Sequence, residues 1–451
     1  MKSIYKLFNS FLLALLVVSF TACNVLEQDP VLDIDSEKAL TNKGGAVAAL
    51  LGAYSELQNN SYYGRDYVAF SYLSSGEAEW SGTYNQYQQF IQHDIVADNN
   101  FLAPMWAQIY RVVNTANHLI AKVPLIQDRN LTEAERSQIL GEAYFIRGLA
   151  YFDLGRAWGG VPLVLSPTGT KNDGAAIGRA TLAQTYAQVL SDLDEAENLL
   201  SAVTVRTRAS KEAAKALKAR LHLYLEEWEH AEQLATEVIE SGNFNLVAPY
   251  TAFVQTKETE ESIFELSYNN ADRNSHAHYG YPSSMGGRYE WHPADQLIAE
   301  LTDPAKGGNR GELISYNGSN PYSTKYYRIG SGDDPAYILR IAEQYLLRAE
   351  ARVKKSASDI SGALSDLNLV RDRAGLDPLN LSDGQEILVA IEQERKLEFV
   401  FEGHQWFDLI RTGRAAEVLG VTDTDKYLYP IPLNEIVADE ALNPEDQNPG
   451  Y

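Results

Sequence analysis

Cysteine is nearly absent from this sequence: Cys23 is the one cysteine among 451 residues, so an internal disulfide is excluded. Positive charge is also scarce. The chain has 38 lysines and arginines against 61 aspartates and glutamates, which gives a formal net charge of -23. Because a phosphate backbone or an anionic membrane surface attracts proteins through clustered cations, this deficit argues against nucleic acid or such a surface as the main partner. A neutral soluble ligand fits better.

Motifs for nucleotide, metal and nucleophilic chemistry are missing as well. We find no phosphate-binding loop and no Gly-x-Ser-x-Gly elbow. Residues 330–332 lack the third glycine of a dinucleotide fingerprint, and residues 422–425 lack the glycine and the twelfth-position glutamate of a calcium loop. We therefore expect no cofactor, no bound metal and no catalytic residues.

Two pairs of side chains leave an alternative open. His276 and His278 have the spacing that points two strand side chains to one face, where they could bind a metal. No carboxylate or cysteine is suitably spaced to complete such a site, so we favour exposed loop histidines. Glu77 and Glu79 could serve as the carboxylate pair of a glycoside hydrolase, but such pairs are equally common on a solvated surface.

The N-terminus predicts export. Lys2 and Lys6 precede an apolar run at residues 11–20 that is too short for a permanent membrane span. Small residues then lead directly to Cys23, which resembles the lipobox of bacterial lipoproteins, although Phe20 stands where those proteins usually have leucine. We expect residues 1–22 to be a signal peptide, Cys23 to be lipidated, and residues 23–43 to form an extended tether. The alternative is an ordinary cleaved signal with a free thiol.

Helical periodicity dominates the rest of the chain and predicts an all-α fold. The length alone allows one large domain or two to three ordinary ones. A first helix has Val47, Leu50, Leu51, Tyr54 and Leu57 on one face. Helix pairs then follow at about 102–241 and 336–413. In the hairpin at 211–240, small and large residues alternate at close-packing positions, which resembles a tetratricopeptide repeat, although the period is irregular.

Two segments, about 59–98 and 244–335, lose this periodicity and are rich in aromatic residues, glycine and asparagine. A structureless stretch as long as the second is improbable unless it is functional. Sugars offer an apolar face and many hydroxyl groups, so a sugar site needs exposed rings beside polar groups. The candidate ligand-binding residues are Asp66, Trp80, Tyr84, Tyr279, Tyr281, Arg288, Tyr289 and Trp291. Alternatively, these rings fill gaps between loops and scaffold, as we expect of Trp106, Trp158, Trp228 and Trp406 on the helices.

Residues 394–413 predict a buried hub. Read as a helix, the segment puts Leu397, Val400 and Phe401 on one stripe, with charged residues at three- and four-residue spacing beside it. Gly403 is expected to end that helix, and the apolar segment 406–410 follows. This stretch needs a large surface to pack against.

Several motifs together resemble the SusD/RagB nutrient-binding lipoproteins. They are the lipobox at Cys23, the stretch 26–30, the block from Tyr144 to Pro162, the block 394–413, and the ending from Tyr429-Pro430 to Asn448-Pro449-Gly450-Tyr451. The resemblance covers essentially the whole chain.

That resemblance implies a single domain, residues 44–451, with a tetratricopeptide-like helical scaffold and a large loop-rich half that carries the ligand site. It further implies an oligosaccharide ligand, no catalytic activity, and docking as a lid on a SusC-like TonB-dependent transporter of the outer membrane, with the lipid-anchored protein facing the cell exterior. The family's ligand residues vary, so the candidates above rest on their chemistry. A surface glycoside hydrolase and a helical-repeat adaptor remain the alternatives.

Overall fold

The computed structural model describes residues 40–169, 177–438 and 441–451, so the signal peptide, Cys23 and most of the tether lie outside the described residues. The described chain is mainly helical, as predicted. No described helix combines the length and the hydropathy needed to cross a bilayer.

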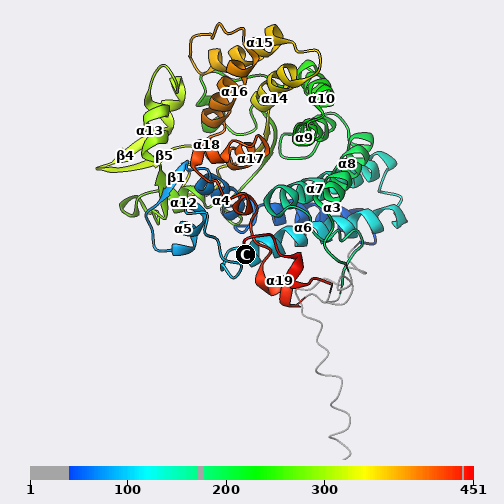
Figure 1. The fold of residues 1–451 in the computed structure, drawn as a ribbon. Coiled ribbons are helices and arrows are strands. Elements are labelled where there is room, and N and C mark those ends of the chain that lie inside the picture. Colours follow the sequence, from blue (N-terminus) through cyan, green and yellow to red (C-terminus); the bar gives the residue numbers. More distant parts are fainter. Residues whose placement is uncertain (1–39, 170–176, 439–440) are drawn as a thin grey trace, which may run out of the picture.

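Nine helices form an arc in which each packs against the next or a close neighbour (Figure 1). They are α3 (Lys43–Leu57), α6 (Leu102–Lys122), α7 (Glu133–Trp158), α8 (Leu182–Leu199), α9 (Lys211–Tyr224), α10 (Trp228–Glu240), α14 (Ile341–Lys354), α15 (Ile360–Arg373) and α16 (Gly384–Glu398). The predicted helix pairs are therefore present. Within α3, Leu50, Tyr54 and Leu57 are buried as predicted. The prediction was wrong for Val47 and Leu51, which are exposed, while Ala46 and Ala53 complete the buried face.

Local sequence explains where the longest helices begin and end. The Thr132 side chain accepts a hydrogen bond from the backbone N–H of Glu135, and the Glu135 carboxylate accepts one from the backbone N–H of Thr132. Thr181 and Gln184 form the same capping box before α8. α7 ends at Gly159, whose φ of 80° is available to glycine at little cost.

Three glycines of α7, spaced seven residues apart, let α8 approach closely. A Cβ atom on Gly141 would lie 2.8 Å from Leu200 Cγ, one on Gly148 would lie 3.2 Å from Leu193 Cδ2, and one on Gly155 would lie 2.7 Å from Tyr186 Cε1. The partners on α8 and its C-cap are also seven residues apart and run in the opposite direction. The two helices are therefore an antiparallel pair in which glycines on one receive large side chains of the other.

The two aromatic segments contain more regular structure than predicted. The first includes α4 (Asp66–Ser74), β1 (Ala78–Trp80) and α5 (Asn85–Ile91). Every residue of α4 is buried, so no polar face marks its period, and the sequence reads as a loop. The second segment holds short elements: α11 (Ala252–Gln255), β2 (Ser262–Leu266), α12 (His276–Gly280), β3 (Trp291–Pro293), α13 (Asp295–Thr302), β4 (Ile314–Asn317) and β5 (Asn320–Ser323).

An antiparallel pairing of β1 with β3 joins these two segments, with Trp80 opposite Trp291. Strand β2 pairs with β6 (Ala336–Arg340), which runs directly into α14, and β4 pairs with β5. Because α14 belongs to the helical arc, the β2–β6 pair joins the loop-rich side to the scaffold.

The hub is buried, and it combines local ion pairs such as Arg411–Asp408 with ion pairs to other parts of the chain. α16 ends at Glu398, earlier than the predicted stop at Gly403, and α17 (Gln405–Arg411) and α18 (Ala415–Leu419) follow. Glu398 is fully buried and pairs with Arg310, Arg340 and Arg373 from distant parts of the chain. The shared carboxylates join α16 to β6 and α15.

The tryptophans expected in the core largely lie there. Trp106, Trp158 and Trp406 are buried, while Trp228 is half-buried at the start of α10. The indole N–H of Trp158 donates to the Pro430 carbonyl at 3.0 Å, which fastens the C-terminal segment, including α19 (Leu433–Ala438), to α7.

Candidate functional site

Five side chains form a layered group at the junction of the two aromatic segments. The rings of Tyr84 and Tyr279 lie nearly parallel with centroids 6.5 Å apart, and Tyr279 stacks on Trp291 at 5.5 Å. The Arg65 guanidinium carbon lies 4.3 Å from the centre of the Tyr279 ring, and that of Arg288 lies 4.7 Å from the centre of Tyr84. We call these five residues the aromatic–arginine cluster.

The residues of the aromatic–arginine cluster come from different helices and strands. Arg65 caps α4, Tyr84 caps α5, Tyr279 lies in α12 and Trp291 begins β3. The β1–β3 pairing therefore assembles the cluster from parts of the chain about two hundred residues apart. Sequence reasoning missed Arg65, although its place beside Asp66 in an aromatic segment was a usable signal.

Carboxylates neutralise both arginines. Arg65 Nε lies 2.6 Å from Asp66 Oδ1, and Arg288 Nη2 lies 3.1 Å from Glu290 Oε1. Burial alone would raise the pKa of Glu290, but the backbone N–H groups of Tyr84 and Thr83 hold it below its usual value. The cluster therefore presents planar guanidinium groups and aromatic rings, and with its two carboxylate partners it has little net charge.

Exposure separates the candidate residues into two groups. Trp80, Tyr84, Tyr279 and Tyr289 are half-buried, and Arg288 is exposed. These five side chains present surface to solvent, although the Tyr289 hydroxyl donates to the Pro321 carbonyl at 3.0 Å.

Asp66, Tyr281 and Trp291 are buried, contrary to the expectation of exposed groups. Asp66 is held by Arg65, Tyr281 packs on Tyr322 with centroids 4.6 Å apart, and Trp291 lies under Tyr279. They support the surface without forming it.

Trp80 adds an unsatisfied donor. Its indole nitrogen is buried and has no hydrogen-bond partner within the described residues, while part of its ring is exposed on β1. A buried N–H without a partner costs about 1–3 kcal/mol, which a hydroxyl group or a water molecule at this position would offset.

Next to Trp291 lies a cavity of about 30 Å³, lined in part by His276 and Phe401, which has room for about one water molecule. His276 is buried, and burial lowers its pKa to about 3. The expectation that both histidines are exposed is therefore wrong for His276. Both lie in α12, a helix, where two-residue spacing separates their directions, so the strand-like metal pair does not form.

Glu77 is also not on the surface. It is 1% exposed, and Oε2 accepts a hydrogen bond from the Phe401 N–H at 3.2 Å, whereas Glu79 is exposed on β1. The expectation of a solvated pair holds for only one of the two. They do not share a common exposed face.

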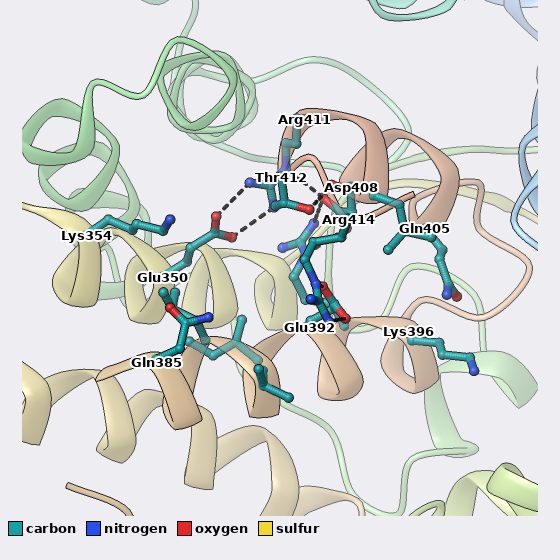
Figure 2. A pocket seen from close by; sticks show the side chains of 15 residues that line it. Glu350, Lys354, Gln385, Glu392, Lys396, Gln405, Asp408, Arg411, Thr412 and Arg414 are labelled. Atoms are coloured by element: carbon teal, nitrogen blue, oxygen red, sulfur yellow. Dashed lines mark hydrogen bonds and ion pairs between the residues drawn. The ribbon is translucent and has the colours of Figure 1, made fainter. Parts of the chain in front are cut away.

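A larger cleft of about 120 Å³ lies between α14, α16 and α17 (Figure 2). Its walls carry the ion pairs Arg411–Glu350 at 2.7 Å, Arg395–Asp408 at 2.8 Å and Arg414–Glu392 at 2.9 Å. Its lining residues include no aromatic ring. A sugar would find no stacking platform there, so the aromatic–arginine cluster remains the better candidate site.

Comparison with known proteins agrees on one family. A family model described as "Starch-binding associating with outer membrane" matches residues 24–223, and a SusD family model matches residues 301–422. Together they cover more than two thirds of the chain.

Among curated relatives, SusD-like protein P38 of Formosa agariphila is 27% identical over the full length of both chains. SusD-like protein P2 of the same species is 26% identical, covering 97% of this chain and 98% of that protein.

Two solved structures show the same fold. A laminarin-binding SusD-like protein is 24% identical with a TM-score of 0.79, covering 91% of this chain and all of that one. A SusD superfamily protein of Bacteroides vulgatus is 19% identical with a TM-score of 0.81, again covering 91% of this chain and all of the other. With the family models, the full-length relatives and the helical arc in agreement, the chain belongs to the SusD/RagB family.

Proposed function

We propose that this protein binds an oligosaccharide at the aromatic–arginine cluster and delivers it to a SusC-like TonB-dependent transporter of the outer membrane, without catalysis. The observation that carries the proposal is the half-exposed pair of parallel rings, Tyr84 and Tyr279, flanked by two charge-compensated arginines. Rings of this kind cover the apolar face of a sugar, and guanidinium groups donate to its hydroxyls.

Affinity electrophoresis in gels that contain a neutral polysaccharide tests the binding step. Starch and laminarin are the first probes, because a matching family model and a solved relative carry those words in their descriptions. A glycan array extends the search. Tyr279→Ala should weaken binding about fivefold, since a stacking contact is worth on the order of 1 kcal/mol.

Tyr316→Ala is the matched control. Tyr316 is 55% exposed on β4 and does not belong to the cluster, so its removal should leave glycan binding unchanged. Equal losses for both variants would contradict the cluster as the site. Retention of full binding by the double variant Tyr84→Ala/Tyr279→Ala would do so as well.

Delivery and anchoring need separate measurements. We infer that Cys23 is lipidated and holds the protein on the outer membrane facing the exterior, so Cys23→Ser should release it into the soluble fraction. The transporter should co-purify with the wild-type protein and with Tyr279→Ala alike. Loss of this association in Tyr279→Ala would favour the adaptor alternative, in which the same surface holds a protein.

Glycan release by the purified protein would establish the hydrolase alternative instead. The carboxylate pair that motivated that alternative is divided between a buried Glu77 and an exposed Glu79. We therefore expect no turnover of any polysaccharide that the protein binds.

A further inference from the structure

Two histidines and a glutamate converge at the turn between α9 and α10. The Nδ1 atom of His222 lies 2.6 Å from Glu227 Oε2, and His230 Nδ1 lies 4.0 Å from the same oxygen. One ligand atom from each of the three residues falls within 4.8 Å of the others. Within the described part of the chain, no other group of three or more histidine, cysteine or carboxylate side chains approaches this closely.

Several local features of the fold bring His222, Glu227 and His230 together. His222 lies in the last turn of α9, and the Glu227 N–H donates to its carbonyl at 2.9 Å. Between them Glu226 adopts a φ of 58°, which reverses the chain sharply. Glu227 then caps α10, and His230 follows three residues later on the same helical face. The backbone thus brings the three side chains together from two helices.

We propose that His222, Glu227 and His230 bind a divalent transition-metal ion, with Zn²⁺ as the best match. Imidazole nitrogens and a carboxylate oxygen are the ligands that zinc and its neighbours prefer, and three protein ligands leave a fourth position for water. This site lies on the helical arc, outside the aromatic–arginine cluster, and does not depend on the proposed glycan binding.

Two of the three side chains can move to close around an ion. His222 is buried and fixed, whereas the side chains of Glu227 and His230 are 47% and 67% exposed and can change rotamer. The hydrogen bond between His222 and Glu227 would open, and the proton they share would leave as the metal enters.

The surrounding charge favours a cation. Glu226 and Glu229 are exposed beside the site, and the whole chain carries a net charge of -23. Lys218 is the nearby opposing charge, but it is engaged by Asp194 at 2.7 Å and Glu197 at 2.8 Å. The simpler interpretation is a hydrogen-bonded His222–Glu227 pair with no metal, in which His230 has no role.

Isothermal titration with ZnCl₂ separates the two interpretations. The protein should carry Cys23→Ser, so that the one thiol of the chain cannot bind zinc. We expect one equivalent of zinc to bind and Tm to rise with zinc. His230→Ala should weaken binding by about tenfold or more, because even outer-shell partners of a metal are worth that much. Since His230 is largely exposed, this variant should fold normally.

His278→Ala is the control, because it removes another exposed histidine far along the sequence and should leave zinc binding unchanged. Glu227→Gln keeps a hydrogen-bonding oxygen beside His222 but loses the anionic ligand, so it should weaken zinc binding while Tm without zinc stays constant. Absence of zinc binding, or equal binding by wild type and His230→Ala, would overturn the proposal.

Discussion

Buried carboxylates join distant parts of this fold. Glu398 is fully buried, and although burial opposes its ionisation, Arg373, Arg340 and Arg310 hold its pKa well below the usual range. Its charge is therefore retained inside the protein because three guanidinium groups surround it. Sequence reasoning placed Glu398 correctly in a buried hub but expected helical partners, since it cannot identify partners that lie far away in the chain.

We predict that Glu398→Gln lowers the free energy of unfolding by about 3–5 kcal/mol, because it leaves buried arginines without their counter-charge. Urea denaturation measures the effect. Glu417→Gln is the control: Glu417 is 70% exposed and pairs with Arg414, and such surface pairs contribute about 0–1 kcal/mol. Similar costs for the two variants would show that the buried network does not stabilise the fold.

Glu77 should affect the pH dependence of stability in the opposite direction to Glu398, because its pKa is raised and that of Glu398 is lowered. Burial raises its pKa from 4.5 to about 8, in spite of the hydrogen bond from the Phe401 N–H. Between these values the folded protein keeps a proton that the unfolded chain has released. The stabilisation from this group is therefore complete below the unfolded pKa and is lost as pH rises through the folded one.

We predict that Glu77→Gln, which stays neutral, loses less stability than wild type between about pH 5 and about pH 8. The difference between the two free energies of unfolding should change by up to about 1.4 kcal/mol per pH unit. Urea denaturation at several pH values measures it. Glu79→Gln, an exposed neighbour, should follow wild type. A wild-type-like slope for Glu77→Gln would mean that Glu77 is ionised in the folded state.

Helices show where periodicity is a sufficient guide and where it is not. Helices α6, α8 and α10 each have one exposed polar face, so their apolar stripes were visible in the sequence. α4 is buried on all sides and has no such stripe, and therefore its nine residues were assigned to a loop. Sequence patterns were also an incomplete guide to the site. The aromatic composition indicated both segments, but only the β1–β3 pairing shows that Trp291 is covered and that Arg65 belongs to the cluster.

The glycines of α7 allow the close packing of α7 against α8 to be tested. We predict that Gly141→Ala destabilises the protein by about 1–3 kcal/mol, since the new methyl group would overlap Leu200 and Leu199 at the α7–α8 interface. This cost exceeds the gain in helix propensity of up to about 1 kcal/mol. Thermal denaturation gives the comparison.

Gly52 provides the matched substitution on an open surface. It lies within α3, and a Cβ atom there would meet nothing within 4 Å. Gly52→Ala should therefore stabilise the protein by about 0.5–1 kcal/mol. We therefore expect the stability to fall in Gly141→Ala and to rise in Gly52→Ala. Stabilisation by both would show that α7 and α8 can separate without cost.

Over the whole molecule, charge should select the kind of glycan. The net charge of -23 repels anionic polymers, and the two arginines of the aromatic–arginine cluster do not reverse this, because Asp66 and Glu290 neutralise them. Given the proposed glycan binding, a neutral polysaccharide should bind equally well at low and high salt. A carboxylated or sulfated one should bind poorly at low salt and improve as salt screens the repulsion.

Affinity electrophoresis at about 0.02 M and about 0.5 M NaCl measures this difference, since the screening length falls several-fold over that range. Glu290→Gln sharpens the test: it keeps an oxygen that can accept from the Tyr84 and Thr83 N–H groups but leaves Arg288 uncompensated. This variant should gain affinity for the anionic polysaccharide at low salt and keep its affinity for the neutral one. If wild type already binds the anionic polymer tightly at low salt and releases it as salt rises, then the arginines act as free cations, and the natural ligand is an acidic glycan.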